Sequence, residues 1–151
     1  MKRVAYGHID GRTEEFCQWA AAVIAPGTVF PSDAYAIACE VGDEIAAVTV
    51  WSGFDQCNCL ISIASDGSRR WMTREFLYRS FAYPFVQLGL PRVTAKVDEI
   101  NSDSLRLGFH LGFIEEGRMR RAAPGGRDEI IMGLLKENCR WIDLNLAKHA
   151  A

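Results

Sequence analysis

Hydrophobic residues recur along the chain at two spacings, one typical of helices and one typical of strands. The first helical stretch begins at Thr13, a residue that can cap it, and ends at Pro26-Gly27. A short strand at residues 4–7 precedes this helix. Three strand-like runs follow it and are expected to form a meander: residues 35–41, 44–51 and 57–65.

The second half of the chain returns to helical spacing. From residue 71 to residue 89, apolar side chains fall on one face of a helix. Pro84 within this stretch predicts a kink, because proline has no backbone N–H to donate. The remaining predicted elements are a strand at 92–97, a helix at 102–111, and strands at 113–120 and 128–135. This order favours an α+β domain, an α/β sandwich in which helices cover a central sheet.

The composition is that of an ordinary globular protein, and residues 1–151 are expected to form a single domain. The 17 Lys and Arg residues against 19 Asp and Glu residues give a net charge of −2, which argues against nucleic acid as a partner. The first ten residues lack the apolar core of a signal peptide, and no run reaches the ~18 apolar residues of a membrane span. We therefore expect a cytoplasmic protein with no membrane partner.

The five cysteines stand at spacings that fit no disulfide framework, so reduced thiols are expected. Cys57 and Cys59 would share one face of a strand and could hold a soft metal ion, but no further ligands stand nearby. Buried or half-buried thiols explain the pair better, and no metal site is predicted.

Two junctions from a strand to a helix carry the polar residues best suited to a ligand. In the first, a turn after Ala64 leads to Arg69 and Arg70 at the start of the long helix. Helix N-termini attract anions, and arginine forks match phosphate oxygens. The local sequence alone is better explained as an ordinary turn with solvated arginines.

The second junction begins the helix at residues 102–111. Asn101 is a good N-cap and Ser104 lies in the first turn, so capping alone would explain both. A functional role requires the two helix starts to lie side by side at the carboxyl edge of the sheet, where open α/β sheets commonly bind ligands.

Four short motifs in the second half of the chain form a set. They are Asn101-x-x-Ser104, Leu111-Gly112-Phe113, Glu116-Gly117 and the closing Asp128-x-Ile130-x-x-Gly133. With the order of elements, they make the region from about residue 60 to residue 141 similar to the GNAT superfamily of acyl-CoA-dependent N-acyltransferases. The branch it most resembles includes the ribosomal-protein N-terminal acetyltransferases. The run 133–142 is also similar to acetyltransferase-like proteins encoded by bacteriophages.

The resemblance implies a mixed, splayed sheet of six to seven strands flanked by helices, with acetyl-CoA between strands 57–64 and 92–97. The backbone that would pair with the pantetheine arm belongs to Leu60, Ile61, Ser62 and Ile63. The pyrophosphate would lie on the turn formed by Ser68, Arg69, Arg70, Trp71, Met72 and Thr73. Asn101 and Ser104 would contact the cofactor arm or lie near its thiol.

Two positions depart from the family pattern. The family's phosphate loop, Arg/Gln-Gly-x-Gly-x-Gly/Ala, aligns with residues 69–74, where both central glycines are absent. Arginine side chains would therefore take a larger share of phosphate binding. Many members place a tyrosine four residues before the Gly-Phe turn to protonate the departing thiolate. Gly108 stands there, and Ser104 or a water molecule could replace the tyrosine.

The family implies direct transfer of the acetyl group, within a ternary complex, to a primary amine of a small molecule, a protein N-terminus or a lysine. The protein would act as a monomer or a homodimer. Glu40 and Asp55 are candidate bases for the amine because the acceptor side of the fold is built there, and each is also explained as a solvated carboxylate. Trp51, Phe54 and Tyr35 could line an acceptor pocket or pack in the core.

Two alternatives stay open. A GNAT-shaped chain without the glycines and the tyrosine could bind acyl-CoA as a sensor or an assembly partner with little chemistry. The acceptor could instead be a nucleobase amine, with Arg118, Arg120 and Arg121 contacting nucleic acid.

Overall fold

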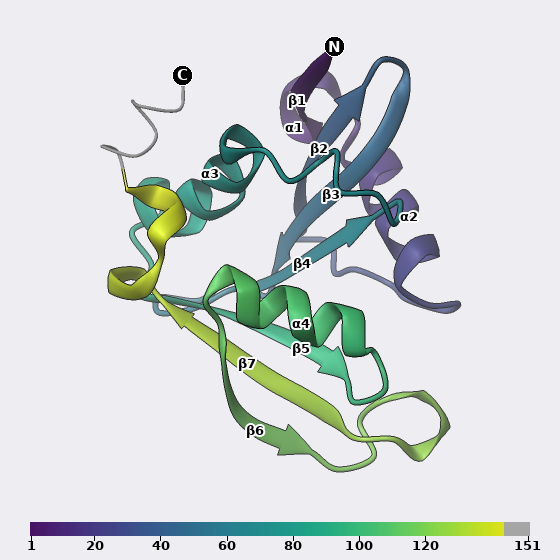
Figure 1. The fold of residues 1–151 in the computed structure, drawn as a ribbon, viewed down its shortest axis with the longest axis vertical. Helices are drawn as coiled ribbons and strands as arrows, with labels where there is room; N and C mark the ends of the chain where they lie inside the picture. The colour runs from purple at the N-terminus through teal and green to yellow at the C-terminus, as the bar shows by residue number, and fades with distance from the viewer. Residues whose placement is uncertain (144–151) are drawn as a thin grey trace.

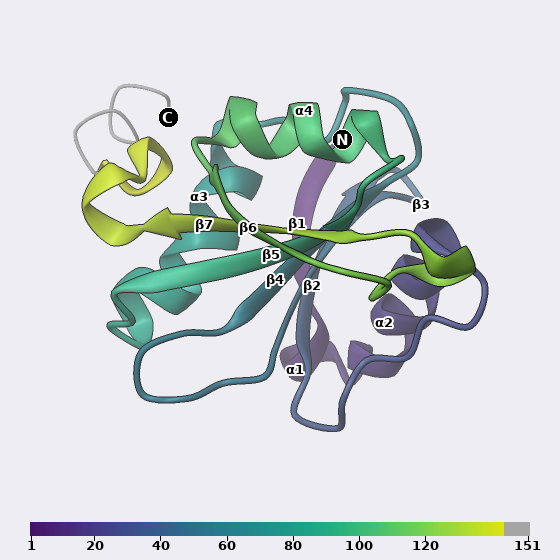
Figure 2. The ribbon, with the colours of Figure 1, turned by 90° about the horizontal axis from the view of Figure 1, so that it is seen from below.

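The computed structural model describes residues 1–143 and contains one seven-stranded sheet with helices on both faces (Figures 1 and 2). The strands are β1 (Lys2–Tyr6), β2 (Tyr35–Val41), β3 (Glu44–Ser52), β4 (Leu60–Ser65), β5 (Arg92–Asp98), β6 (Ile114–Met119) and β7 (Glu129–Leu135). The helices are α1 (Gly7–Asp10), α2 (Thr13–Ile24), α3 (Arg74–Ala82) and α4 (Ser102–Leu111), with short turns η1 (Tyr83–Gln87), η2 (Pro124–Gly126), η3 (Lys136–Asn138) and η4 (Arg140–Ile142). The predicted mixed sheet flanked by helices is confirmed.

The sheet is ordered β1-β2-β3-β4-β5-β7-β6, and each neighbouring pair is antiparallel except β4 and β5. These two parallel strands are joined at one position, where Leu60 lies opposite Thr94. Beyond it they diverge towards their carboxyl ends, as Figure 1 shows. Each strand is fully paired on its other side, β4 with β3 and β5 with β7. The sheet is therefore splayed between β4 and β5.

Two hydrophobic clusters pack against opposite faces of the sheet. Phe16 and Ala20 of α2 are fully buried against small residues of β2, β3 and β4. The larger cluster lies on the other face and includes Phe76 and Phe81 of α3 together with Met132 of β7. Figure 2 shows α1 and α2 on one side of the sheet and α4 on the other. The two faces of the sheet are thus covered by different helices, and the cluster around α3 spans both parts of the splayed sheet.

Two local predictions differ from the structure, and the predicted kink at Pro84 takes a specific form. Thr13 is the first residue of α2 and no side chain caps that helix, whose N-cap position is Arg12. Pro84 is accommodated by a π-helical turn, in which the Leu88 N–H donates to the Tyr83 carbonyl at 3.0 Å. Cys57 and Cys59 precede β4 and lie in its approach loop, so they do not share a strand face.

Two observations on the described residues bear on the metal and membrane predictions. Cys57 is exposed and Cys59 is buried, and within residues 1–143 no group of three or more His, Cys, Asp or Glu side chains is arranged to hold a metal ion. No helix in the same described range is long and apolar enough to cross a membrane.

Candidate cofactor site between diverging strands

The edge of β4 that faces β5 carries backbone groups with no strand beside them. The Asp66 N–H donates to the carbonyl of Ala46 in β3 at 2.9 Å, and with the register this identifies the β4 residues whose backbone groups point towards β3. Because these directions alternate along a strand, Ile61, Ile63 and Ser65 point theirs towards β5. Past the single pairing with β5, this edge is open to an extended ligand that adds to the sheet as a strand does.

The alternation narrows the predicted set of pantetheine-binding residues. Leu60 and Ser62 lie opposite Ser52 and Val50 in the register with β3, so their backbone groups are directed to that strand. Ile61 and Ile63 remain as the members of the predicted set whose backbone faces the diverging side. Sequence periodicity marks a strand, but only the register tells which edge each peptide group faces.

The turn from β4 to α3 is held in shape by its own side chains. The Asp66 carboxylate accepts hydrogen bonds from the Ser68 N–H at 2.9 Å and the Ser68 hydroxyl at 2.6 Å. Trp71 is buried and its indole N–H donates to the Ser68 carbonyl at 3.0 Å. Thr73 caps α3 by accepting from the Phe76 N–H at 3.1 Å. This turn keeps a fixed form without the family's glycines.

The two arginines of the turn differ in their surroundings. The Arg70 guanidinium contacts the Glu44 carboxylate at 3.1 Å and the Asp66 carboxylate at 2.8 Å, and these hydrogen bonds raise the pKa of Arg70. Arg69 is exposed and forms no ion pair with any residue in the described range 1–143. Arg69 is therefore the predicted phosphate ligand whose charge is available, whereas Arg70 must exchange a carboxylate for a phosphate.

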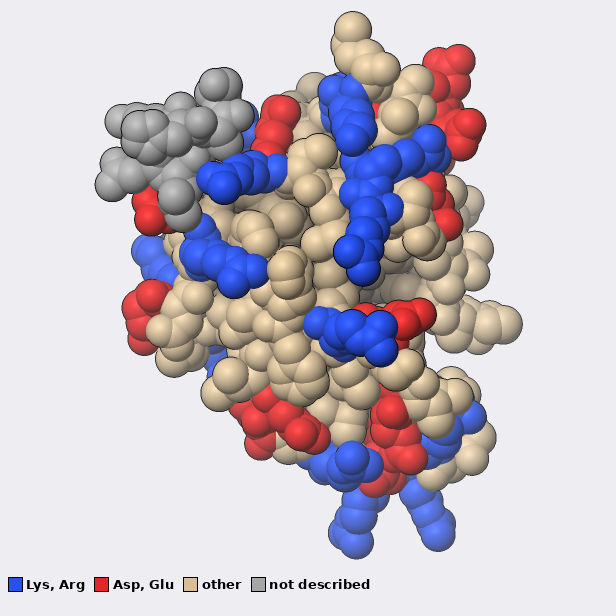
Figure 3. All heavy atoms as spheres, in the orientation of Figure 1, with Lys and Arg blue, Asp and Glu red and all other residues tan. Residues whose placement is uncertain are grey.

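The start of α4 lies across from this turn in both ribbon views (Figures 1 and 2). Asn101 caps the helix, since its side-chain oxygen accepts from the Ser104 N–H at 3.1 Å, as the capping interpretation predicts. Ser104 itself is half-buried. Figure 3 shows the surface hollowed between the end of β4 and the start of α4, with Lys and Arg side chains along one edge. The turn after β4 and the start of α4 thus follow the carboxyl ends of the two diverging strands, and the prediction that they form one ligand site stays a prediction.

Gly108 is packed against β7. A Cβ atom at this position would lie 2.8 Å from the terminal methyl carbon of Met132, which is fully buried. A tyrosine in this place would meet Met132 before it reached the space between β4 and β5. The absence of the family's tyrosine is thus matched by a methionine that fills the adjoining volume.

The Glu40 carboxylate is held in ion pairs rather than left open to an acceptor. Its side chain is 6% exposed and pairs with Arg3 at 2.9 Å and Arg12 at 3.1 Å. Burial would raise the pKa of Glu40, but hydrogen bonds from the two arginines outweigh burial and leave that pKa below its usual value. The residue also lies on β2, two strand spacings or roughly 10 Å from β4. The Glu40 carboxylate is a structural ion-pair partner.

Asp55 lies close to the joined end of β4 and β5. Its carboxylate accepts from the Cys57 and Asn58 N–H groups at 2.7 and 2.8 Å, shaping the loop between β3 and β4. The Asn58 side-chain oxygen then accepts from the Thr94 hydroxyl at 2.8 Å, beside the pairing of Thr94 with Leu60. The prediction that Asp55 serves the acceptor stays a prediction, with a location that suits it.

The aromatic residues predicted for an acceptor pocket separate into two kinds. Trp51 is buried, and its indole N–H donates to the Ser80 carbonyl at 2.9 Å, which makes it part of the core. Tyr35 is 42% exposed and Phe54 is half-buried, and both contact the ring of Tyr83, at 5.8 and 6.2 Å between centroids. Tyr83 was missed because it follows α3 in sequence and meets β2 only in the fold.

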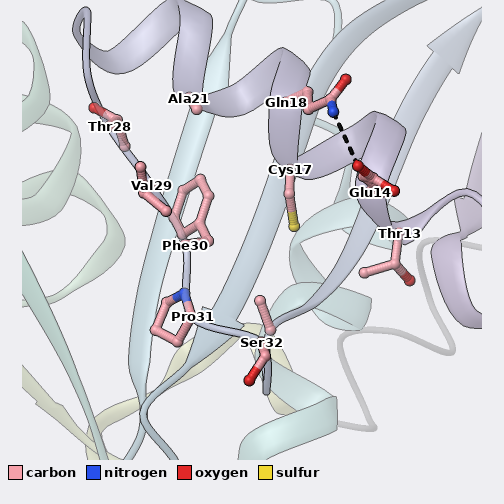
Figure 4. Close-up of a pocket in the computed structure, with 11 residues that line it drawn as sticks. Thr13, Glu14, Cys17, Gln18, Ala21, Thr28, Val29, Phe30, Pro31 and Ser32 are labelled. Atoms are coloured by element: carbon pink, nitrogen blue, oxygen red, sulfur yellow. Dashed lines mark hydrogen bonds between the residues drawn. The ribbon is translucent and has the colours of Figure 1, made fainter.

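A separate open groove of about 540 Å³ lies between α2 and the segment that leads to β2 (Figure 4). Among its lining residues, Glu14 and Cys17 are ionisable, and Glu14 accepts a hydrogen bond from Gln18 at 3.2 Å. Burial raises the pKa of the Cys17 thiol, which leaves it a poor nucleophile at neutral pH. None of the predicted site residues lines this groove, so we place the candidate site at the diverging strands.

One of the three arginines proposed for nucleic-acid contact is neutralised by neighbouring carboxylates. Arg118 pairs with Glu99 at 3.2 Å and with Asp128 at 3.4 Å. Arg120 and Arg121 are exposed beside this pair of carboxylates. The local charge is therefore mixed, which disfavours a phosphate-binding patch.

No family model matches the chain, and no curated protein matches it, whereas solved structures do. The N152L mutant of SpeG, a spermidine N-acetyltransferase from Vibrio cholerae, has a TM-score of 0.70 at 13% identity over 95% of this chain and 98% of that one. SpeG from the same organism in complex with manganese ions has a TM-score of 0.66 at 12% identity, over 90% and 93%.

A presumed acetyltransferase from T. thermophilus has a TM-score of 0.64 at 24% identity over 80% of this chain and 69% of that one. At such identities the likeness shows the fold alone, which this chain shares with these acetyltransferase structures. The closer similarity to the ribosomal-protein branch and to bacteriophage proteins stays a prediction.

Proposed function

We propose that the chain is an N-acetyltransferase that moves the acetyl group of acetyl-CoA to a primary amine by direct attack in a ternary complex. One observation carries this proposal: β4 and β5 are adjacent and parallel but paired at a single position. The open β4 edge then accepts the pantetheine arm as a strand, with its peptide groups bonded to Ile61 and Ile63.

The residues at the diverging end fit the rest of such a cofactor. Arg69 and the first turn of α3 would hold the pyrophosphate, with Arg70 joining after exchange from Glu44 or Asp66. Ser104, half-buried in the first turn of α4, would lie beside the thiol end of the arm.

Acetyl-CoA supplies an activated acyl group whose carbonyl carbon accepts a neutral amine. The Ile63 N–H is directed towards that space and would polarise the carbonyl oxygen. A C–N bond forms and the C–S bond breaks; the sulfur leaves with the bonding electron pair and takes up a proton, while the amine gives one up. Ser104 or water would provide the proton to sulfur, since position 108 carries no side chain.

A calorimetric titration with acetyl-CoA, joined to a thiol-release assay, tests the proposal. The acceptor panel would include spermidine, because SpeG is a spermidine N-acetyltransferase, a peptide with a free N-terminus and a peptide whose only amine is lysine. We expect micromolar-range binding and release of thiol with at least one amine. Arg69→Ala should weaken binding, and Ser104→Ala should lower turnover more than binding.

Acyl-CoA binding without turnover is the second function to which a specific observation points. Position 108 has no side chain and Met132 fills the neighbouring space, so the tyrosine that many members of the family use as an acid is absent there. Tight binding of acetyl-CoA with no thiol release for any amine in the panel would favour this sensor-like function over the enzyme.

A further inference from the structure

Three aromatic rings gather at the joined end of β4 and β5. Tyr35, Phe54 and Tyr83 contact one another pairwise, with ring centroids 5.8, 6.2 and 6.3 Å apart and interplanar angles between 67° and 88°. They come from the start of β2, the loop before β4 and the turn after α3. All three keep part of their surface exposed. Aromatic rings carry negative faces and positive edges, so exposed ring faces of this triad suit a cation.

Two carboxylates lie beside the triad. Asp33 accepts weakly from the Gly53 and Phe54 N–H groups, at 3.4 and 3.3 Å, and Asp55 accepts from the N–H groups that follow it in the same loop. No ion pair joins either to a lysine or an arginine among residues 1–143. The charge of both is therefore uncompensated beside rings that favour a cation.

These groups converge on Cys59, the residue that closes the β4–β5 junction. The Cys59 carbonyl accepts the Thr94 N–H at 2.9 Å. Burial raises the pKa of the Cys59 thiol to about 12, and the carboxylates of Asp55 and Asp33 act on it in the same direction. Both carboxylates are thus close to the point where the two strands meet, towards which a pantetheine arm laid along β4 from the α3 turn would run.

We propose that Tyr35, Phe54 and Tyr83, with Asp33 and Asp55, bind the acceptor as a primary alkylammonium ion. The ring faces contact the cationic nitrogen and the hydrocarbon next to it, and the carboxylates provide the opposite charge. Acceptors that carry a carboxylate within a few carbons of the amine, as 4-aminobutanoate does, are excluded by repulsion from Asp33 and Asp55. This inference rests on the proposed acetyl transfer and adds the class of amine. The bound ammonium ion gives one proton to solvent water before the neutral amine attacks the thioester.

The test uses butylamine, 1,4-diaminobutane and 4-aminobutanoate, which share one primary amine and differ in the charge of the far end. Amide NMR shifts of the full chain with coenzyme A report binding without any need for turnover. We expect butylamine and the diamine to move signals of residues 53–59, and 4-aminobutanoate to leave them unchanged. Thiol release with the same amines should follow the same order.

Variants separate the charge from the rings. Asp33→Asn with Asp55→Asn should weaken butylamine binding about five- to tenfold and remove the discrimination against 4-aminobutanoate. Tyr35→Leu should weaken it about two- to fivefold, and Tyr35→Phe should restore it because the ring is kept. Asp43→Asn, in the exposed turn between β2 and β3, is the matched control and should change nothing.

The outcomes are distinguishable from those for acetyl-CoA. If amines shift the amide signals of residues 53–59 while acetyl-CoA is not bound or consumed, the proposed cation site of aromatic rings and carboxylates is supported and the transferase proposal fails. If thiol is released but no amine moves this loop, or the double aspartate variant binds butylamine as tightly as the natural chain, the cation site is wrong. Equal use of 4-aminobutanoate and butylamine would overturn it as well.

Discussion

Replacement of Glu40 by glutamine should reduce stability and leave catalysis unchanged. The Glu40 carboxylate is 6% exposed, while its partners Arg12 and Arg3 are 28% and 65% exposed. Breaking a fully buried pair costs about 3–5 kcal/mol and an exposed pair at most about 1 kcal/mol. The exposure of the arginines places this cluster between those limits, so Glu40→Gln should lower the free energy of unfolding by about 2 kcal/mol at pH 7.

The pH dependence gives the sign of the effect. Because the folded-state pKa of Glu40 is lowered, its stabilisation is fully present above the ordinary value of about 4.3 and disappears as pH falls through the folded pKa. Urea titrations should therefore show a midpoint about 1 M lower for the variant at pH 7. The two midpoints should converge below the folded pKa of Glu40.

Activity provides the contrasting readout for the same variant. Below its melting temperature, Glu40→Gln should keep the kcat of the natural chain, since the residue lies two strands from β4. A large fall in kcat with unchanged stability would refute the ion-pair assignment and return Glu40 to the role of base. A difference in midpoint that persists to low pH would refute the charge argument.

Three further changes test other parts of the site. Gly108→Val should destabilise the chain by about 2 kcal/mol, because its side chain meets Met132 in a filled core, and an unchanged thermal midpoint would contradict this packing. Glu44→Gln should tighten acetyl-CoA binding two- to threefold in calorimetry by releasing Arg70 from one of its two carboxylates, and an equal or weaker affinity would count against Arg70 as a phosphate ligand. Thr73→Ala should cost about 1 kcal/mol in denaturant unfolding through loss of the α3 cap, with Thr73→Ser restoring it; an alanine variant as stable as the natural chain would dismiss the cap.

The regular elements were predictable because each shows one clear periodicity. Residues 35–41 and 102–111 match β2 and α4 at both ends, since a turn or a cap bounds each side. The start of β4 was placed three residues early, because the apolar run from Cys57 continues the strand pattern while Asp55 folds that segment into a turn. The hydrophobic pattern alone does not reveal a side chain that accepts a hydrogen bond from the backbone two residues away.

The site was predictable in its location and less so in its members. Arg70 and Glu40 were sensible choices as charged residues, but both meet opposite charges from segments 26 and 28 residues away in sequence. The Glu116-Gly117 and Gly133 motifs contributed to the resemblance, but their physical role could not be read from the sequence. In the fold, Glu116 reaches over Gly133, which lacks a side chain there, to pair with Arg92 at 2.6 Å.

The one-residue junction between β4 and β5 also has a consequence for local opening of the structure. Strands β1 to β4 form one hydrogen-bonded ladder and β5 to β7 another, so the two ladders are joined through little more than the α3 core and that junction. Amide protons should then exchange in two cooperative groups rather than one. A molecule bound along β4 would connect the two ladders, and the two groups of amide protons should then exchange at a common rate.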